Sequence, residues 1–229
     1  FPFNVPNGVV RMDTPWAVVR PELDQLPGAC KNYFTVQRWV DISNDRLGLT
    51  WATPDAPLIE IGKITNDPRD PSVGWIDTIE PSTTIYSYVM NNYWETNYKA
   101  TQEGPTTFRY AIRPHRGYDG ARATKFGVEI GQPLVAVLNP DGPSPRSSVV
   151  RIEPSNVVAT ILKPSRNGRA WILRLFNPTE QSHRVALDWS EPTPKKVCVS
   201  NLAEEAGTPL DERIEMAPYE FVTVRAQLP

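Results

Sequence analysis

Residues 90–98 bring together side chains that could bind a sugar. Three asparagines, three aromatic residues and a threonine occupy these nine positions, directly after the strand-like run 84–89. Aromatic faces cover the apolar C–H patches of a sugar ring, and amide and hydroxyl groups form hydrogen bonds with its hydroxyl groups. The same composition is also typical of a turn that asparagines cap over a core filled by rings. Both interpretations stay open at this point.

Catalytic motifs are absent from the sequence. A glycosidase typically needs two carboxylates on either side of the bond it cleaves, and none of the 26 acidic residues stands in a recognisable pair. The two histidines, His115 and His183, each have an arginine beside them, which disfavours a bound cation. No His-x-His, His-Glu-x-x-His or paired-cysteine spacing predicts a metal site, and no Gly-x-Ser-x-Gly predicts a nucleophile. The chain alone is therefore predicted to bind no metal and to be catalytically inactive.

The bulk composition is that of a soluble globular protein. Of the 229 residues, 40% are apolar and 22% are charged, and no apolar run is long enough to predict a membrane span. A formal net charge of −2 gives no reason to expect nucleic acid or an anionic membrane as a partner. Cys30 and Cys198 are expected to be free thiols, so the cellular compartment stays open. Phe1 as first residue is typical of a chain cut from a larger protein or processed.

Short β-strands separated by turns are expected along most of the chain. The 24 prolines leave little room for long helices, with one exception at 118–130, where Asp119 could cap a helix that Gly131 ends. The proline-rich segment 139–148 predicts a linker or a long surface loop. After it, the strand spacing suggests a small immunoglobulin-like β-sandwich. The segments expected as strands are 35–42, 47–52, 83–90, 106–112, 134–138, 156–162, 170–176, 183–187, 196–199 and 221–226.

Several motifs along the chain resemble one protein family. Asn-Asn-Tyr-Trp-Glu-Thr-Asn at 91–97 leads into Phe-Arg-Tyr at 108–110. Upstream lie Arg-Pro-Glu-Leu-Asp-Gln-Leu-Pro-Gly at 20–28, Val-Gln-Arg-Trp-Val-Asp at 36–41 and Thr-Trp-Ala-Thr-Pro-Asp-Ala-Pro-Leu at 50–58, and downstream lie Arg-Leu-Phe-Asn-Pro-Thr at 174–179 and Asn-Leu-Ala-Glu-Glu at 201–205. Together these motifs resemble the C-terminal region of glycoside hydrolase family 38, the zinc-dependent α-mannosidases. The resemblance implies a non-catalytic part of an enzyme.

The resemblance also implies which residues bind carbohydrate. In the family, the C-terminal β domains pack on the catalytic domain and lend residues to the substrate cleft. The asparagines and Thr96 would recognise hydroxyl groups, Tyr93 or Trp94 would stack on the sugar ring, and Arg109 would pin the loop through backbone carbonyls or a carboxylate such as Glu95 or Glu103. The alternative is a loop that merely joins two domains. The substrate-binding residues predicted in this way are Asn91, Asn92, Tyr93, Trp94, Thr96, Asn97 and Arg109.

The fold and the partner follow from the same resemblance. It implies an all-β chain, with a galactose-mutarotase-like supersandwich portion and one short helix in residues 1–142 and a small C-terminal β-sandwich in residues 148–229. An N-terminal catalytic domain of the same polypeptide would contain an aspartate nucleophile, an acidic partner and a zinc ion held by His and Asp residues. We therefore expect no cofactor in this chain, and a parent protein that is a zinc-dependent glycosidase acting on a mannoside.

Two other classes of function remain possible. A stand-alone carbohydrate-binding module would expose Tyr93, Trp94 and Tyr98 on the face of a sheet, and a structural or interaction domain would use none of these residues for a ligand. An exposed apolar patch near residues 91–98 would favour the hydrolase region, because that surface should meet the catalytic domain. A groove lined by rings and amides, without such a patch, would favour the binding module.

Overall fold

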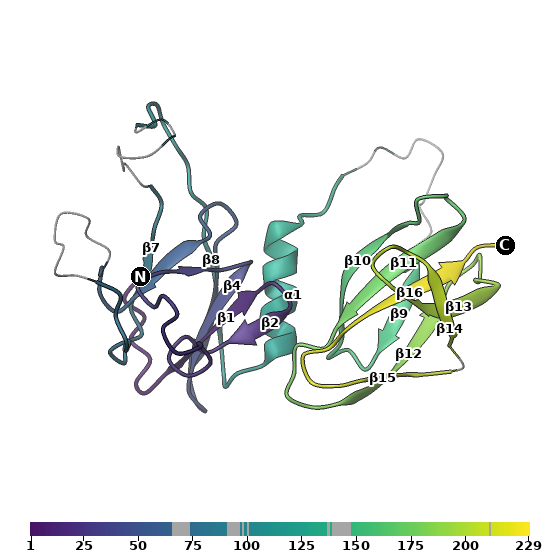
Figure 1. Cartoon of the computed structure of the whole chain (residues 1–229), viewed down its shortest axis with the longest axis horizontal. Helices are drawn as coiled ribbons and strands as arrows, with labels where there is room; N and C mark the ends of the chain where they lie inside the picture. The colour runs from purple at the N-terminus through teal and green to yellow at the C-terminus, as the bar shows by residue number, and fades with distance from the viewer. Residues whose placement is uncertain are drawn as a thin grey trace. The chain divides into compact units, whose positions relative to one another are not determined.

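The protein is a β protein with one short helix in the part of the chain that the structure describes. This computed structural model describes residues 1–65, 74–90, 97, 99, 101–136, 138, 148–210 and 212–229, which form strands β1 to β16 and helix α1 (Figure 1). The predicted all-β fold class is confirmed. The chain divides into two compact units, Phe1–Tyr118 with Phe126–Gly131, and Asp119–Lys125 with Gln132–Pro229. The bounds 1–142 and 148–229 stay predictions, because residues 139–147 lie outside the described part.

The first unit contains two antiparallel sheets. The five-stranded sheet has the order β2-β1-β4-β5-β8 and the three-stranded sheet the order β3-β6-β7. The strands of the larger sheet are β1 (Val9–Thr14), β2 (Ala17–Val19), β4 (Trp39–Ser43), β5 (Gly48–Ala52) and β8 (Ala111–His115). Those of the smaller sheet are β3 (Phe34–Thr35), β6 (Leu58–Ile61) and β7 (Ile85–Ser87). Both β7 and β8 are the last strands of their sheets, and the predicted sugar-binding segment follows β7 in the sequence and precedes β8.

Apolar side chains from both sheets form the core of the first unit. Val40 and Ile42 of β4, Trp51 of β5, and Ile59 and Ile85 of the smaller sheet are completely buried in one cluster. Successive side chains on a strand point to opposite faces of the sheet. The face that carries Val40 and Ile42 therefore lies on this core, and the other residues of β4 project to the opposite face.

Helix α1 (Gly120–Gly131) packs on part of that opposite face through its second half, Phe126–Gly131, which belongs to the first unit. Its predicted start is confirmed, because Asp119 Oδ1 accepts a hydrogen bond from the backbone N–H of Arg122 at 3.0 Å. Gly127 allows close packing, since a Cβ atom there would lie 2.7 Å from Cδ1 of the buried Trp39. No helix in the described ranges is long and apolar enough to cross a membrane.

A buried polar cluster occupies the same face of the larger sheet. The Asp41 side chain is fully buried, and its Oδ1 accepts a hydrogen bond from Ser43 Oγ at 2.6 Å. Its Oδ2 accepts from Thr50 Oγ1 at 3.0 Å and lies 2.8 Å from His115 Nε2. The other ring nitrogen, Nδ1, lies 2.6 Å from the carbonyl oxygen of Gly117. Because a carbonyl oxygen can only accept, Nδ1 carries a proton and Nε2 faces the carboxylate. Burial raises the pKa of Asp41, while the Ser43 hydroxyl and His115 lower it.

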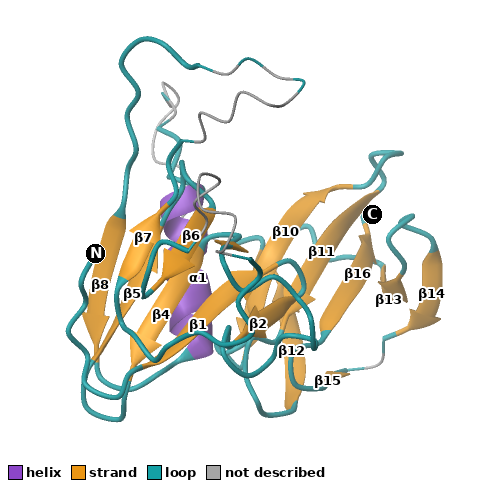
Figure 2. Cartoon of the chain, turned by 60° about the vertical axis from the view of Figure 1, so that its left-hand side comes forward, coloured by secondary structure: helices purple, strands orange, loops and turns teal. Residues whose placement is uncertain are grey.

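The second unit is a β-sandwich (Figure 2). One sheet has the order β10-β11-β16-β13-β14 and the other the order β15-β12-β9. Leu173, Leu175 and Val224 of the larger sheet share a core cluster with Val185 and Ile214 of the smaller one. The strands are β9 (Val150–Glu153), β10 (Val158–Pro164), β11 (Ala170–Phe176), β12 (His183–Trp189), β13 (Lys196–Ser200), β14 (Ala206–Pro209), β15 (Ile214–Met216) and β16 (Phe221–Gln227).

Asn177 fixes the turn that follows β11. Its side chain is completely buried, and Nδ2 donates to the carbonyl oxygens of Gln181 at 2.7 Å and Ala217 at 2.8 Å. Oδ1 accepts hydrogen bonds from the backbone N–H of Thr179 at 3.1 Å and from its hydroxyl at 2.8 Å. The motif at 174–179 therefore satisfies buried polar groups of three chain segments.

Candidate functional site

Most of the predicted sugar-binding residues lie outside the described part of the chain. This holds for Asn91, Asn92, Tyr93, Trp94 and Thr96. Asn97 is described and exposed, and Arg109 is described with most of its side chain in solvent. The structure therefore shows the supports on either side of the segment, and the sugar-binding roles stay predictions.

Asp55 anchors Arg109 from the turn that follows β5. The backbone N–H of Arg109 donates to Asp55 Oδ2 at 2.8 Å, Nε donates to the same oxygen at 2.9 Å, and Nη2 donates to Oδ1 at 2.8 Å. These hydrogen bonds lower the pKa of Asp55 to about 2. Sequence reasoning named Glu95 and Glu103 as carboxylate partners of Arg109 and missed Asp55, which is 54 positions away along the chain.

The Asp55→Asn variant is expected to loosen the backbone at Arg109. An amide side chain cannot accept both prongs of the guanidinium fork as well as the backbone N–H. We expect faster hydrogen exchange at the Arg109 amide in this variant, measured by NMR at neutral pH. In the wild-type chain the pKa of Asp55 is depressed, so the contribution of the pair is present above pH 3.8 and is lost as the pH falls through about 2. Unchanged exchange in the variant would contradict the anchoring role.

A second contact joins the strands on either side of the segment. The hydroxyl groups of Ser87, at the end of β7, and Tyr110, directly before β8, lie 2.8 Å apart. The Tyr110 ring stacks on the buried Trp51, with 5.4 Å between ring centroids. Tyr88 also makes an edge contact with Tyr33, at 6.3 Å between centroids. Asp55, Ser87 and Tyr110 therefore fix described residues that precede and follow the segment in the sequence.

Arg38, in another of the family-like motifs, lies near a buried carboxylate. Its Nη1 is 3.9 Å from Oδ2 of Asp13 on β1, and the Asp13 side chain is almost completely buried. Burial raises the pKa of Asp13 to about 7, and the charge of Arg38 opposes that shift. A pKa so far above its ordinary range is typical of a functional group, or of a buried group that lowers the stability of the fold when it ionises. The described surroundings of Asp13 are those of a buried carboxyl group whose Oδ2 has no hydrogen-bond partner among the described residues.

The histidines are engaged in contacts other than metal binding. Among the described residues, no group of three or more His, Cys, Asp and Glu side chains could hold a metal ion. Both ring nitrogens of His115 lie in the polar cluster around Asp41, and His183 Nε2 lies 2.9 Å from Thr179 Oγ1. The described residues therefore form no set that fits the zinc ion that the family resemblance implies.

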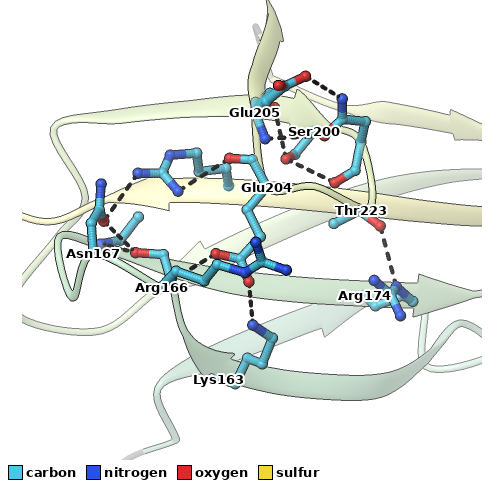
Figure 3. Close-up of polar contacts among 12 residues, drawn as sticks. Lys163, Arg166, Asn167, Arg174, Ser200, Glu204, Glu205 and Thr223 are labelled. Carbon is cyan, nitrogen blue, oxygen red and sulfur yellow. Dashed lines mark hydrogen bonds and ion pairs between the residues drawn. The ribbon is translucent and has the colours of Figure 1, made fainter.

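The motif at 201–205 forms a strap over the outer face of the larger sheet of the second unit (Figure 3). Glu204, between β13 and β14, forms an ion pair with Lys163 on β10 and accepts a hydrogen bond from the backbone N–H of Arg166 at 2.8 Å. It thereby reaches across β16 and β11. Charged side chains in a turn beside a β-sandwich are usually solvated. The Glu204 side chain is instead 10% exposed, because the strap folds back on the sheet.

The fold and these contacts define a β protein of two units, the second of which is a sandwich. Within that class, residues 156–224 match the family model described as the glycosyl hydrolases family 38 C-terminal beta sandwich domain. The predicted resemblance to the C-terminal region of this family is confirmed. Among curated proteins, no sequence matches this chain.

Two solved structures share the fold over almost the whole chain. An alpha-mannosidase from Enterococcus faecalis V583 has a TM-score of 0.66 and 15% sequence identity, and the match covers 99% of this chain and 25% of that one. A protein in the glycosyl hydrolase family 38 from Enterococcus faecalis has a TM-score of 0.65 and 16% identity, and the match covers 96% of this chain and 25% of that one. The present chain spans about a quarter of the length of each of these proteins.

Proposed function

We propose that this chain is the non-catalytic C-terminal β region of an α-mannosidase-type glycoside hydrolase. The observation that carries the proposal is the match of residues 156–224 to the family 38 C-terminal domain. The likeness in fold to a quarter of two longer family members supports a catalytic domain in the same polypeptide. In the proposed protein that domain holds the zinc ion and the catalytic acids, and the present chain scaffolds it.

The proposed contribution to the substrate cleft comes from Asn91, Asn92, Tyr93, Trp94, Thr96 and Asn97, with Arg109 as support. Amide and hydroxyl groups would bind the hydroxyl groups of a mannoside, and an aromatic ring would stack on the sugar. The anchoring of Arg109 by Asp55 and the contact between Ser87 and Tyr110 support this role. A binding segment gains affinity when its ends are fixed before the ligand arrives.

Variants of the segment should impair hydrolysis by the complete enzyme. In a polypeptide that includes the proposed catalytic domain, we expect Asn92→Ala and Trp94→Ala each to lower kcat/KM for an α-mannoside by about tenfold or more, because each removes a contact with the sugar. Steady-state hydrolysis of a chromogenic mannoside measures the effect. Asn156→Ala, an exposed asparagine of the second unit, is the matched control and should leave kcat/KM unchanged.

Two results would contradict the proposed function. If both segment variants have the kcat/KM of the wild-type enzyme, these residues do not contribute to the substrate cleft. The proposed scaffold role would not be affected by that result. Hydrolysis of the mannoside by the 229-residue chain on its own would show that catalytic groups reside in this region.

A further inference from the structure

A recess in the second unit lies beside the strap. Its volume is about 320 Å³, and it is lined by Arg166, Asn167, Ala203, Glu204, Ala206 and Arg225. Three segments contribute to it: the turn after β10, the strap between β13 and β14, and strand β16. The two alanines leave the recess open to solvent, so a small ligand can enter it.

The charge of Arg225 is not matched by a described carboxylate. Its Nη1 donates to the carbonyl oxygen of Glu204 at 3.3 Å, and its Nη2 donates to Asn167 Oδ1 at 3.4 Å. Both acceptors are neutral and both hydrogen bonds are long. Within the described ranges, no carboxylate forms an ion pair with Arg225, and the Arg166 side chain acts on the Glu204 carboxylate through its charge without an ion pair. A half-buried guanidinium with two long neutral contacts retains much of its attraction for an anion.

The negative charge of Glu204 is already compensated by other groups. Its carboxylate binds the ammonium group of Lys163 and the backbone N–H of Arg166 (Figure 3). The hydrogen bond from Lys163 is the main reason that the pKa of Glu204 is lowered. The carboxylate is thus turned toward Lys163, while Arg166 and Arg225 supply the positive charge of the recess.

The walls of the recess are held by hydrogen bonds before any ligand binds. Asn167 Oδ1 accepts hydrogen bonds from Ser165 Oγ at 2.8 Å and from the backbone N–H of Arg169 at 3.1 Å, which fixes the first turn. In the strap, Asn201 Oδ1 accepts from the backbone N–H of Glu205 at 3.0 Å. Fixed walls reduce the entropy that is lost when a ligand is ordered.

We propose that this recess binds a small oxyanion of the phosphate class through the guanidinium groups of Arg166 and Arg225. The planar donor fork of arginine matches the oxygens of a phosphate group, and the recess is large enough for such an ion. The ligand could be free phosphate or a phosphate monoester, since both present the same oxygens. This site is independent of the proposed role in a hydrolase, because it lies in the second unit and uses none of residues 91–97.

Titration of the whole chain with inorganic phosphate tests the site. At low ionic strength and neutral pH, we expect saturable NMR shifts of the Asn167, Ala203 and Ala206 amides. A parallel titration with methyl phosphate distinguishes the sources: tighter binding of the monoester would support an esterified ligand, and tighter binding of phosphate a free ion. Shifts that grow linearly without saturation, or that spread over the whole surface, would overturn the proposal.

Variants separate a specific site from general charge attraction. Arg225→Gln should weaken binding by about tenfold or more, since a charge-assisted hydrogen bond is lost. Arg116→Gln removes an exposed arginine of the first unit and should leave the affinity unchanged. Arg166→Gln serves as a second test, because its exposed side chain can be changed without disturbing the sheet. If both recess variants bind phosphate as tightly as the wild-type chain, the proposal is wrong.

Discussion

The His115→Ala variant is expected to lose about 3 kcal/mol of the free energy of unfolding, because it leaves buried polar groups without a partner. Asp41 has no exposed side-chain surface, and His115 Nε2 approaches its Oδ2 to 2.8 Å. Without the imidazole, the carboxyl group keeps the hydroxyl groups of Ser43 and Thr50 as donors but has lost the ring nitrogen that lay 2.8 Å from its Oδ2. The carbonyl oxygen of Gly117 also loses its donor.

Chemical denaturation followed by tryptophan fluorescence measures this effect. Trp39 and Trp51 are completely buried in the same unit and should report its unfolding. Adding Asp41→Asn to His115→Ala removes the carboxyl group that the first change left without its partner, so the double variant should be less destabilised than the sum of the two single variants. Strict additivity would contradict coupling between the two side chains. Arg116→Gln, at an exposed neighbouring position, should change stability by less than about 0.5 kcal/mol.

Gly48 shows how the backbone accommodates this cluster. A Cβ atom on Gly48 would lie 2.5 Å from Cε1 of His115 and 2.6 Å from Cβ of Ser43. The strand position opposite His115 must therefore be a glycine for the imidazole to reach Asp41. The sequence pattern did not predict this pairing, because His115 lies 65 positions from Thr50 along the chain.

The longer strands of the second unit were predictable because their hydrophobic patterns are regular, whereas the short strands β9, β14 and β15 were not expected. The expected segment 170–176 coincides with β11, and 196–199 and 221–226 fall within β13 and β16. The helix expected at 118–130 forms at Gly120–Gly131, where an aspartate cap and a terminal glycine gave a clear signal. In these segments, local propensity and the buried face point to the same structure.

Two expected strands were wrong, and three strands of the first unit were missed. The expected strand at 106–112 is instead β8 at Ala111–His115. Residues 134–138 were also expected as a strand, but the described ones among them form none, and Leu134 and Val135 are almost fully exposed. Strands β1, β2 and β6 were not expected at all. An apolar run indicates that a segment can form a β-strand. Whether it does so depends on a partner strand that only the tertiary structure supplies.

The sequence predicted which residues form the candidate site but not which other residues contact them. The asparagines and aromatic rings of 91–97 follow from sequence composition and from the family resemblance. Asp55, Ser87 and Tyr110 fix described residues on either side of that segment in the sequence. No sequence motif marks them as parts of a site. Their role appears when β5, β7 and β8 bring them together.

The second large effect is expected in the pH dependence of stability, through Asp13. Its side chain is 3% exposed, and Oδ2 has no hydrogen-bond partner among the described residues. Arg38 is the nearest cation, at 3.9 Å. Desolvation therefore dominates and raises the pKa of Asp13 from 3.8 to about 7. The folded protein is more stable with a protonated Asp13 carboxyl group than with an ionised one.

The sign of the effect follows from proton binding. Between pH 3.8 and about 7, the unfolded chain loses the Asp13 proton while the folded chain keeps it. The contribution of the neutral carboxyl is thus fully present below pH 3.8 and is lost as the pH rises through about 7. Each pH unit in this window is worth about 1.4 kcal/mol. We expect the wild-type free energy of unfolding to fall by up to ~4 kcal/mol relative to that of Asp13→Asn between pH 4 and pH 8.

Denaturation curves of the two chains over this pH range test the expectation. The difference in the free energy of unfolding between Asp13→Asn and the wild-type chain should increase with pH. The asparagine cannot ionise, whereas the buried aspartate must ionise as the pH rises. Asp45→Asn, an exposed aspartate between β4 and β5, is the control and should follow the wild-type curve. If the Asp13→Asn curve instead runs parallel to that of the wild-type chain, then Asp13 is ionised in the folded protein throughout, and Arg38 or solvent must stabilise its charge far better than a distance of 3.9 Å allows.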